Sequence, residues 1–313
     1  MKTILFNKYY RSFNILSLIL IIVSLVLLLF KGLNYGIDFR GGTMIMIQTP
    51  EKIKVADFRD ILKDLEVGDT SVTKISDPAT KLTSGLVTSE KNLVMVRIEQ
   101  DNNEEAVQNR KIISVKKALK AEISDIVFLQ TESVGGKVSA ELVRTGVWAV
   151  ILAVCAVLFY IWIRFEWQFS LGAILALFHD VIVTLGLFSL LNLEINLSII
   201  AAVLTIVGYS MNDTVVIFDR VRENLRKYSD IKIYELTNIS INETLSRTLI
   251  TSITTLLALL SIFFFGGEVL KGFSLAMIFG VIFGTYSSIY IANTILVRLN
   301  VSQKTVLREA DKN

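Results

Sequence analysis

Apolar runs alternate with polar segments along the whole chain. The first apolar run covers residues 13–30, and five more come after a long stretch of mixed charge. A bilayer is crossed by a helix of about 20 apolar residues. We therefore predict six transmembrane helices, at residues 13–30, 144–163, 170–191, 195–218, 248–265 and 273–297.

The polar stretch between the first two runs has the patterns of a small folded domain. Apolar residues alternate or cluster in short runs at 43–48, 71–75, 93–98 and 126–131, which is typical of strands. They recur at helical spacing at 55–65 and 104–123. The order β-α-β-β-α-β predicts a ferredoxin-like α+β domain, with residues 76–91 as a loop or hairpin.

These patterns divide the chain into four parts. We expect a cytoplasmic arm with the first helix at 1–33, an external ferredoxin-like domain at 34–141, a five-helix bundle at 142–298 and a cytoplasmic tail at 299–313. The loops between helices that this topology places inside the cell are rich in Lys and Arg, whereas the short external loops contain only Lys271, which fits the positive-inside rule. The first helix is then an uncleaved signal anchor, and both termini are cytoplasmic.

Composition excludes several classes of site. Of 313 residues, 52% are hydrophobic, and the net charge is only +3, so we expect lipid contact and no nucleic-acid binding. A single cysteine and a single histidine leave no disulfide framework and no set of metal ligands. The chain also lacks a phosphate-binding loop and a hydrolase motif. We therefore expect no enzyme activity and no cofactor.

Asp213 stands out because it follows an apolar run that starts at Leu197. A carboxylate at membrane depth costs about 2.5–3.5 kcal/mol, so it usually has a functional role. Ser210 shares its helix face, and Asn212 lies on a neighbouring polar stripe. The alternatives are a structural ion pair for Asp213 and simple interhelical hydrogen bonds for the other two. We expect the opposite side, with Leu204, Met211, Val215 and Phe218, to face lipid.

The next helix offers a cation for that carboxylate. Arg247 and Thr251 begin a polar face at its cytoplasmic end, at the depth of Asp213 if the two helices are antiparallel. Arg247 would hold Asp213 ionised until a proton displaces it. Alternatively, Arg247 extends to the lipid headgroups or pairs with Glu243, four residues before it.

Two other membrane features attract attention. His179 and Asp180 lie near the middle of their run and suit either a proton relay or a hydrogen-bonded packing pair. In the last run, small residues four positions apart predict a close helix contact. They are Ala276, Gly280, Gly284 and Ser288.

Two motifs carry a resemblance to a known family. Residues 35–43 read Y-G-I-D-F-R-G-G-T, which resembles the signature shared by SecD and SecF translocase subunits. Residues 207–224 read V-G-Y-S-M-N-D-T-V-V-I-F-D-R-V-R-E-N, which is similar to SecF in particular. The first motif contributes Gly36, Asp38, Phe39, Arg40, Gly41 and Gly42.

The resemblance implies a function. SecF subunits pair with SecD in the bacterial inner membrane, associate with the SecYEG channel and use the proton motive force to draw unfolded preproteins across. They are related to exporters of the resistance-nodulation-division superfamily. Asp213 and Arg247 match the family's proton-translocation residues. The alternatives are a proton-coupled exporter of small molecules or lipids, which would have about twice as many spans, and a purely structural docking subunit.

Overall fold

The computed structural model describes residues 4–49, 53–63, 65, 67, 70–75, 92–99, 105–123, 125–228 and 230–310. The expected loop at 76–91 lies outside the described residues. Two units can be distinguished: one joins Met1–Asn34 with Trp148–Asn313, and the other is Tyr35–Val147.

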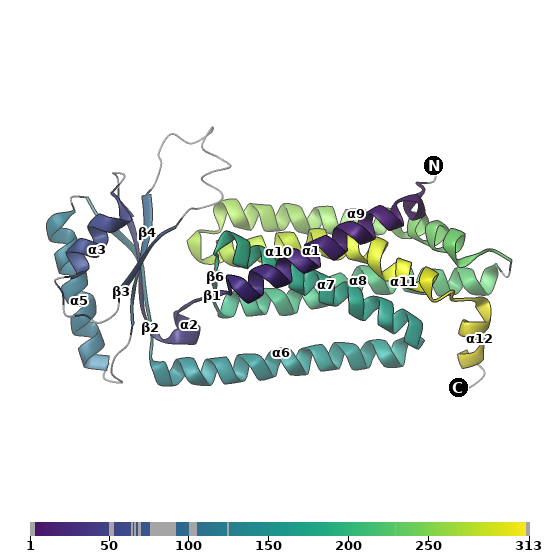
Figure 1. Cartoon of the computed structure of the whole chain (residues 1–313), viewed down its shortest axis with the longest axis horizontal. Helices are drawn as coiled ribbons and strands as arrows, with labels where there is room; N and C mark the ends of the chain where they lie inside the picture. Colours follow the sequence, from purple (N-terminus) through teal and green to yellow (C-terminus); the bar gives the residue numbers. More distant parts are fainter. Residues whose placement is uncertain are drawn as a thin grey trace. The chain divides into compact units, whose positions relative to one another are not determined.

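The smaller unit is a four-stranded sheet with two helices on one face (Figure 1). Its elements are β2 (Gly42–Thr49), α3 (Val55–Lys63), β3 (Thr70–Ile75), β4 (Asn92–Ile98), α5 (Glu105–Glu122) and β5 (Val127–Val134). The strand order is β3-β4-β2-β5, and the neighbouring strands are antiparallel. This is the order of a ferredoxin-like domain, so the prediction from the sequence is confirmed.

The core of this unit follows from the two periodicities. Ile45 and Ile47 alternate along β2, and they pack with Phe58 of α3 and Val115 of α5. Ile45, Ile47 and Phe58 are all completely buried. The apolar residues that alternate on the strands and those at helical spacing on α3 and α5 therefore form one core between the sheet and the helices.

The glycine pair just before β2 is required by backbone geometry. A short helix, α2 (Ile37–Arg40), ends at Gly41, which has a φ of 74°, and Gly42 has a φ of 116°. Side chains rarely tolerate this region. A Cβ on Gly42 would also lie 2.5 Å from the carbonyl oxygen of Ile98. Glycine is thus needed at both positions to connect α2 with the central strand.

The larger unit is helical. Its elements are η1 (Phe6–Tyr9), α1 (Tyr10–Phe30), α6 (Gly136–Arg164, which begins in the smaller unit), α7 (Trp167–Leu191), α8 (Leu197–Lys227), α9 (Ile233–Phe265), α10 (Glu268–Ser287), η2 (Ser288–Ala292), α11 (Asn293–Arg298) and α12 (Gln303–Ala310). The strands β1 (Asn34–Tyr35) and β6 (Glu194–Ile195) have two residues each.

Six of the helices within the described residues are long and apolar enough to cross a membrane. The prediction of six spans is confirmed, and the chain is a multi-pass membrane protein. Several helices are longer than the apolar runs: α9 begins at Ile233, although the apolar pattern starts only at residue 248. Polar residues continue a helix readily outside the bilayer, so hydropathy marks the membrane segment and not the helix end.

The tight turn between α7 and α8 is explained by two asparagines. Asn192 ends α7 in the left-handed conformation with a φ of 55°. Asn196 caps α8, and its side chain accepts a hydrogen bond from the backbone N–H of Ile199 at 3.1 Å. The two helices therefore reverse direction within a few residues, which fixes their membrane depths relative to each other.

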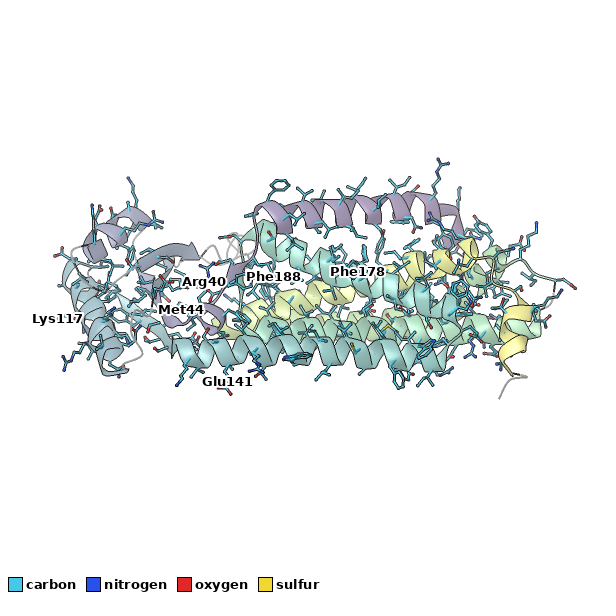
Figure 2. All side chains as sticks on the ribbon, turned by 60° about the horizontal axis from the view of Figure 1, so that its bottom comes forward. Arg40, Met44, Lys117, Glu141, Phe178 and Phe188 are labelled. Atoms are coloured by element: carbon cyan, nitrogen blue, oxygen red, sulfur yellow. The ribbon has the colours of Figure 1, made fainter. Side chains whose placement is uncertain are left out.

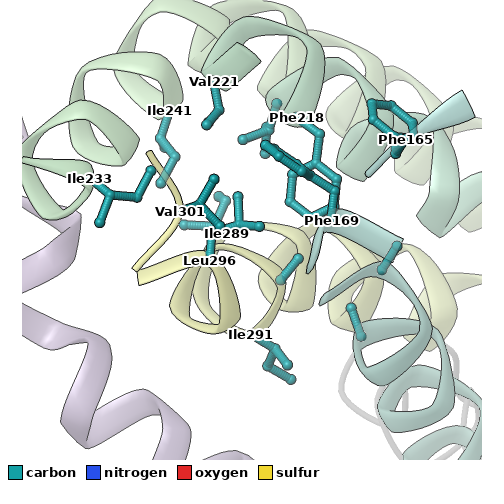
Figure 3. Close-up of a cluster of buried hydrophobic side chains, with 14 of the residues drawn as sticks. Phe165, Phe169, Phe218, Val221, Ile233, Ile241, Ile289, Ile291, Leu296 and Val301 are labelled. Atoms are coloured by element: carbon teal, nitrogen blue, oxygen red, sulfur yellow. The ribbon is translucent and has the colours of Figure 1, made fainter. Parts of the chain in front are cut away.

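A cluster of buried apolar side chains joins α7, α8, α9, η2 and α11 (Figure 3). Phe169 of α7 and Phe218 of α8 meet edge to face, with ring centroids 5.2 Å apart. Met211 belongs to the same cluster. Our prediction that Met211 and Phe218 face lipid was wrong, because both side chains are buried in this cluster, where Phe218 packs on Phe169 of α7.

Candidate functional site

Asp213 lies inside the bundle, where three helices meet. Its side chain belongs to α8, and the residue is only 4% exposed. Thr285 of α10 donates a hydrogen bond to Asp213 Oδ2 at 3.4 Å, and the hydroxyl of Thr285 lies 2.7 Å from that of Ser252 on α9. The carboxylate is thus reached by a chain of two hydroxyl groups from two neighbouring helices.

Arg247 is exposed and takes no part in this contact. Within the residues described, no ion pair joins Arg247 to Asp213. Glu243 pairs with Arg220, with N–O 2.7 Å, and not with Arg247, so the pairing within one helix suggested by the sequence was wrong. Thr251 donates to carbonyl groups of its own helix. Arg247 therefore lies beyond ion-pair distance of Asp213, although its positive charge still acts on that carboxylate.

A second buried carboxylate, Asp180, lies on α7. Phe178, labelled in Figure 2, is 61% exposed, whereas His179 and Asp180 are completely buried. His179 Nδ1 lies 2.9 Å from Asp180 Oδ1. Asp180 Oδ2 accepts hydrogen bonds from Ser210 of α8 at 2.6 Å and Ser287 of α10 at 2.7 Å. The structure thus brings Ser210 to Asp180, although the sequence assigned it to the face of Asp213.

One turn of α10 bonds to both carboxylates. Thr285 contacts Asp213, and Ser287 contacts Asp180. Ser288 follows immediately, and its hydroxyl lies 2.7 Å from that of Thr214 on α8. At Ser288 the helix changes into the π-helical turn η2. Such π turns inside helices are frequent at functional sites, so this turn is a natural place for a change in one carboxylate to alter helix geometry.

Small residues allow α8 and α10 to approach closely enough for these bonds. Ala276 and Ser288 are completely buried. A Cβ on Gly280 would collide with Ile206, and one on Gly284 would lie 3.1 Å from Ser210 Cβ. The predicted close-packing face of the last helix is therefore confirmed. Its partner is α8.

We expect Gly284→Val to lower the free energy of unfolding by about 1–3 kcal/mol, because the added side chain overpacks the contact with Ser210. Thermal unfolding of the purified chain in detergent measures this loss. Gly208→Val is the matched control, since a Cβ on Gly208 of α8 meets nothing within 4 Å. Equal destabilisation by the two variants would contradict this description of the helix contact.

Asn212 and several other polar or small side chains of the membrane helices are exposed. On α8 they are Ala201, Thr205, Gly208 and Asn212, and on α9 they are Arg247, Thr254, Ala258 and Ser261. The members of each set are three, four or seven residues apart, which places them in a stripe along one helix face. Polar groups facing hydrocarbon are unfavourable. We therefore expect both stripes to be covered by another membrane protein.

Four charged residues form a network of ion pairs beside the start of α7, in which Arg222 also lies 3.9 Å from Asp219. Arg164 donates to both carboxylate oxygens of Asp219 at 2.8 Å. Arg222 pairs with Glu166 at 3.0 Å, and the Glu166 side chain is only 1% exposed. Both arginines also stack on the ring of Phe165. These contacts join the ends of α6, α7 and α8.

Thr285, Ser287 and Ser252 were not among the candidate residues predicted from the sequence. Hydroxyl side chains are common in membrane helices, where they often donate to their own backbone, so a single one is a weak signal. A stronger signal was the run T-Y-S-S at 285–288 inside an otherwise apolar helix. In the part of the chain that the structure describes, no group of three or more His, Cys, Asp or Glu side chains could hold a metal ion.

Comparison with known proteins supplies the family. A family model described as protein export membrane protein SecD/SecF, C-terminal, matches residues 114–302. The protein translocase subunit SecF of Cereibacter sphaeroides is 46% identical over 287 residues, which cover 92% of this chain and 86% of that relative. The chain belongs to the SecF family. The SecF of Rhodothermus marinus is 41% identical over 300 residues, 94% of this chain and 92% of that one.

Solved SecDF structures share the fold. The crystal structure of SecDF from Thermus thermophilus, described as a translocon-associated membrane protein, superimposes with a TM-score of 0.82 at 34% identity over 95% of this chain. SecDF in its super-membrane-facing form gives 0.67, also at 34% identity. The chain covers only 38% and 40% of those longer chains. The SecF family therefore has relatives in which such a chain is one part of a larger polypeptide.

The SecD/SecF GG motif, matched at residues 26–49, coincides with the segment that contains α2 and the glycine pair. Gly36 and Ile37 are buried, and the backbone carbonyl of Asp38 accepts a hydrogen bond from Ser139 at 2.9 Å. Phe39 packs edge to face on Tyr35, with centroids 5.9 Å apart. Arg40 is exposed. In this SecF-family chain the motif thus has a clear role in shaping the backbone before β2.

Proposed function

We propose that this chain works with SecD as a membrane subunit of the Sec translocase and uses the proton motive force to promote preprotein export through SecYEG. The observation that carries this proposal is Asp213, buried among membrane helices and hydrogen-bonded through a hydroxyl to α10. The names of the relatives supply the setting: SecF translocase subunits and translocon-associated SecDF. Proton binding at the buried carboxylate of Asp213 is the step that couples the proton motive force to export in this proposal.

Proton binding at Asp213 changes the contact between α8 and α10. An ionised carboxylate only accepts hydrogen bonds, whereas a protonated one can also donate. The bond from Thr285 is long, and Thr285 can turn its hydrogen to Ser252 instead. A membrane potential contributes about 2.3 kcal/mol per charge per 100 mV. That energy is comparable with the cost of rearranging such hydrogen bonds, so it can bias the helices between two packings.

SecD covers the exposed polar stripes of α8 and α9 in this proposal. Arg247 and Asn212 lie on these stripes, and Arg247 forms no ion pair with Asp213 within the described residues. A SecD helix packed here would enclose Arg247 and complete the path by which protons reach Asp213. The proton-translocation role predicted for Arg247 is therefore retained as a role at the interface with SecD.

The positions of the two termini and of the ferredoxin-like domain follow the topology predicted from the sequence. The chain resides in the bacterial inner membrane with both termini in the cytoplasm, where Arg220, Arg222 and Arg226 satisfy the positive-inside rule. The ferredoxin-like domain, residues 34–141, is then external. Together with SecD, it alternately holds and releases an unfolded preprotein as the helices repack.

Complementation tests this function. In bacteria depleted of their own SecF and SecD, the chain and the SecD of the same genome should restore export of a pulse-labelled preprotein. The restored rate should fall to the depleted level when a protonophore is added. Export that is not restored, although both proteins are in the membrane, would contradict the proposal. An export rate that does not respond to the protonophore would contradict the coupling to protons.

A further inference from the structure

The pair His179–Asp180 is a buried polar site that the mechanism at Asp213 does not use. Both side chains are completely buried in the middle of α7. Asp180 accepts hydrogen bonds at both carboxylate oxygens, from His179 on one side and from Ser210 and Ser287 on the other. His179 Nε2, in contrast, is buried and has no hydrogen-bond partner within the described residues. A buried polar atom without a partner requires an explanation.

The hydrogen bonds of Asp180 determine the tautomer of His179. Oδ2 is occupied by two hydroxyl donors, so the carboxylate is held with Oδ1 facing Nδ1 at 2.9 Å. A carboxylate oxygen accepts hydrogen bonds, so the imidazole carries its hydrogen on Nδ1. Nε2 is then left with a lone pair. This is the arrangement in which a carboxylate orients an imidazole so that its other nitrogen can bind a proton.

The described neighbours of Asp180 include no other charged group that neutralises it. In the residues described, its only ion-pair partner is His179. Among the titratable groups on the helices packed against α7, Tyr286 of α10 lies beside the imidazole, with ring centroids 5.9 Å apart. Asp213 of α8 is three residues beyond Ser210, and Tyr290 of η2 packs on Tyr286. The charged side chains of these elements otherwise belong to helix ends: Arg11, Asp219, Arg220, Arg222, Glu223, Arg226, Lys227, Lys271 and Arg298.

We propose that His179 Nε2 is a second proton-binding site within the membrane, with Asp180 as the residue that positions and compensates it. The proton adds to the lone pair of Nε2, and neutral imidazole becomes imidazolium beside the Asp180 carboxylate. No bond to another atom breaks, and the pair changes from a net charge of −1 to zero. The proposal extends the proposed function, since it adds a second proton site to a chain already inferred to use protons.

Ser287 links this site to the turn that also serves Asp213. Its hydroxyl lies 2.7 Å from Asp180 Oδ2 and 3.1 Å from the carbonyl oxygen of Gly284, and its single hydrogen can bond to either. A positive charge on His179 attracts the negative charge of Asp180. It therefore weakens the hydrogen bond that Ser287 donates to Asp180 Oδ2. Thr285, two residues earlier, bonds to Asp213. Proton binding at either carboxylate site therefore acts on the same turn of α10, next to η2.

The chain contains one histidine, which makes a direct test simple. The full-length chain is labelled with ¹⁵N-histidine, purified through a tag without histidine and placed in lipid bilayers. Solid-state NMR then records the two imidazole nitrogens as the pH is varied. We expect Nδ1 to remain protonated throughout and Nε2 to change from an imidazole to an imidazolium signal. An Nε2 signal that stays constant at every pH where the protein remains folded would overturn the proposal.

Variants separate a positioning role from a purely structural one. Asp180→Asn should weaken proton binding at Nε2 about tenfold or more, because the compensating charge is lost. If that variant does not fold, Ser287→Ala should strengthen binding by a smaller factor, because it removes a donor that shares the negative charge of Asp180, and Ser210→Ala should act in the same direction. Asp213→Asn should leave the titration of His179 in place. Unchanged proton binding at His179 in the folded Asp180 or serine variants would refute the proposed site. Loss of that binding in Asp213→Asn would show that the site is not separate from Asp213. Neither result depends on the outcome of the export assay.

Discussion

Asp213→Asn is expected to abolish the part of preprotein export that depends on the proton motive force. The amide has nearly the same shape as the carboxylate and can still accept a hydrogen bond from Thr285, so the packing of α8 against α10 should persist. It cannot bind or release a proton in the physiological range. Export into inverted membrane vesicles, measured with and without a protonophore, should therefore be equally slow in both conditions.

Asp219→Asn is the matched control for this experiment. It makes the same chemical change on the same helix, but the Asp219 side chain is 41% exposed and pairs with Arg164 at the helix end. We expect vesicles with this variant to retain the stimulation by the proton motive force. A subunit that only docks SecD to the channel would tolerate both amides. Full stimulation in Asp213→Asn would therefore favour a docking subunit and exclude proton coupling through this residue.

Arg222→Ala is expected to destabilise the helical unit strongly. It removes the cation that pairs with Glu166, whose side chain is 1% exposed, and so leaves a buried carboxylate without its partner. Breaking a buried pair in this way costs about 3–5 kcal/mol. Thermal unfolding of the purified chain, followed by tryptophan fluorescence, should show a large decrease in the midpoint temperature.

Arg164→Ala provides the comparison for Arg222→Ala. Both arginines stack on Phe165 and both pair with a carboxylate, but the pair of Arg164 with Asp219 is exposed to solvent. An exposed pair contributes about 0–1 kcal/mol. The double variant Glu166→Gln with Arg222→Ala should recover most of the lost stability, because no buried charge remains. Equal effects of the two arginine substitutions would contradict the role assigned to burial.

Periodicity in the sequence was enough to predict the elements and their order. Alternation in residues 43–48 and helical spacing in 55–65 and 104–123 identified the sheet and the helices that cover it. The apolar runs identified all six spans. Both signals work because burial selects side chains residue by residue, and each type of element repeats with its own period. The four-residue spacing of Gly280 and Gly284 also located the contact with α8 correctly.

Periodicity could not predict which residues of other helices contact each helix face. Depth along the two helices predicted that Arg247 lies near Asp213, and its charge does act on that carboxylate, but depth could not show that Thr285 of α10 makes the direct hydrogen bond, because that depends on rotation about the helix axis. Glu243 likewise bonds to Arg220 on another helix and not to Arg247 on its own. Met211 was assigned to lipid because the pattern shows that a face is apolar, not whether another helix covers it.

Proton uptake by sealed proteoliposomes that contain the chain together with SecD is the decisive test of proton coupling through Asp213. A membrane potential, negative inside, is imposed, and a dye enclosed in the vesicles reports the internal pH. We expect acidification with the unmodified chain and with Asp219→Asn, and none beyond the background of empty liposomes with Asp213→Asn. Acidification by Asp213→Asn at the rate of the unmodified chain would show that protons do not pass by way of this carboxylate.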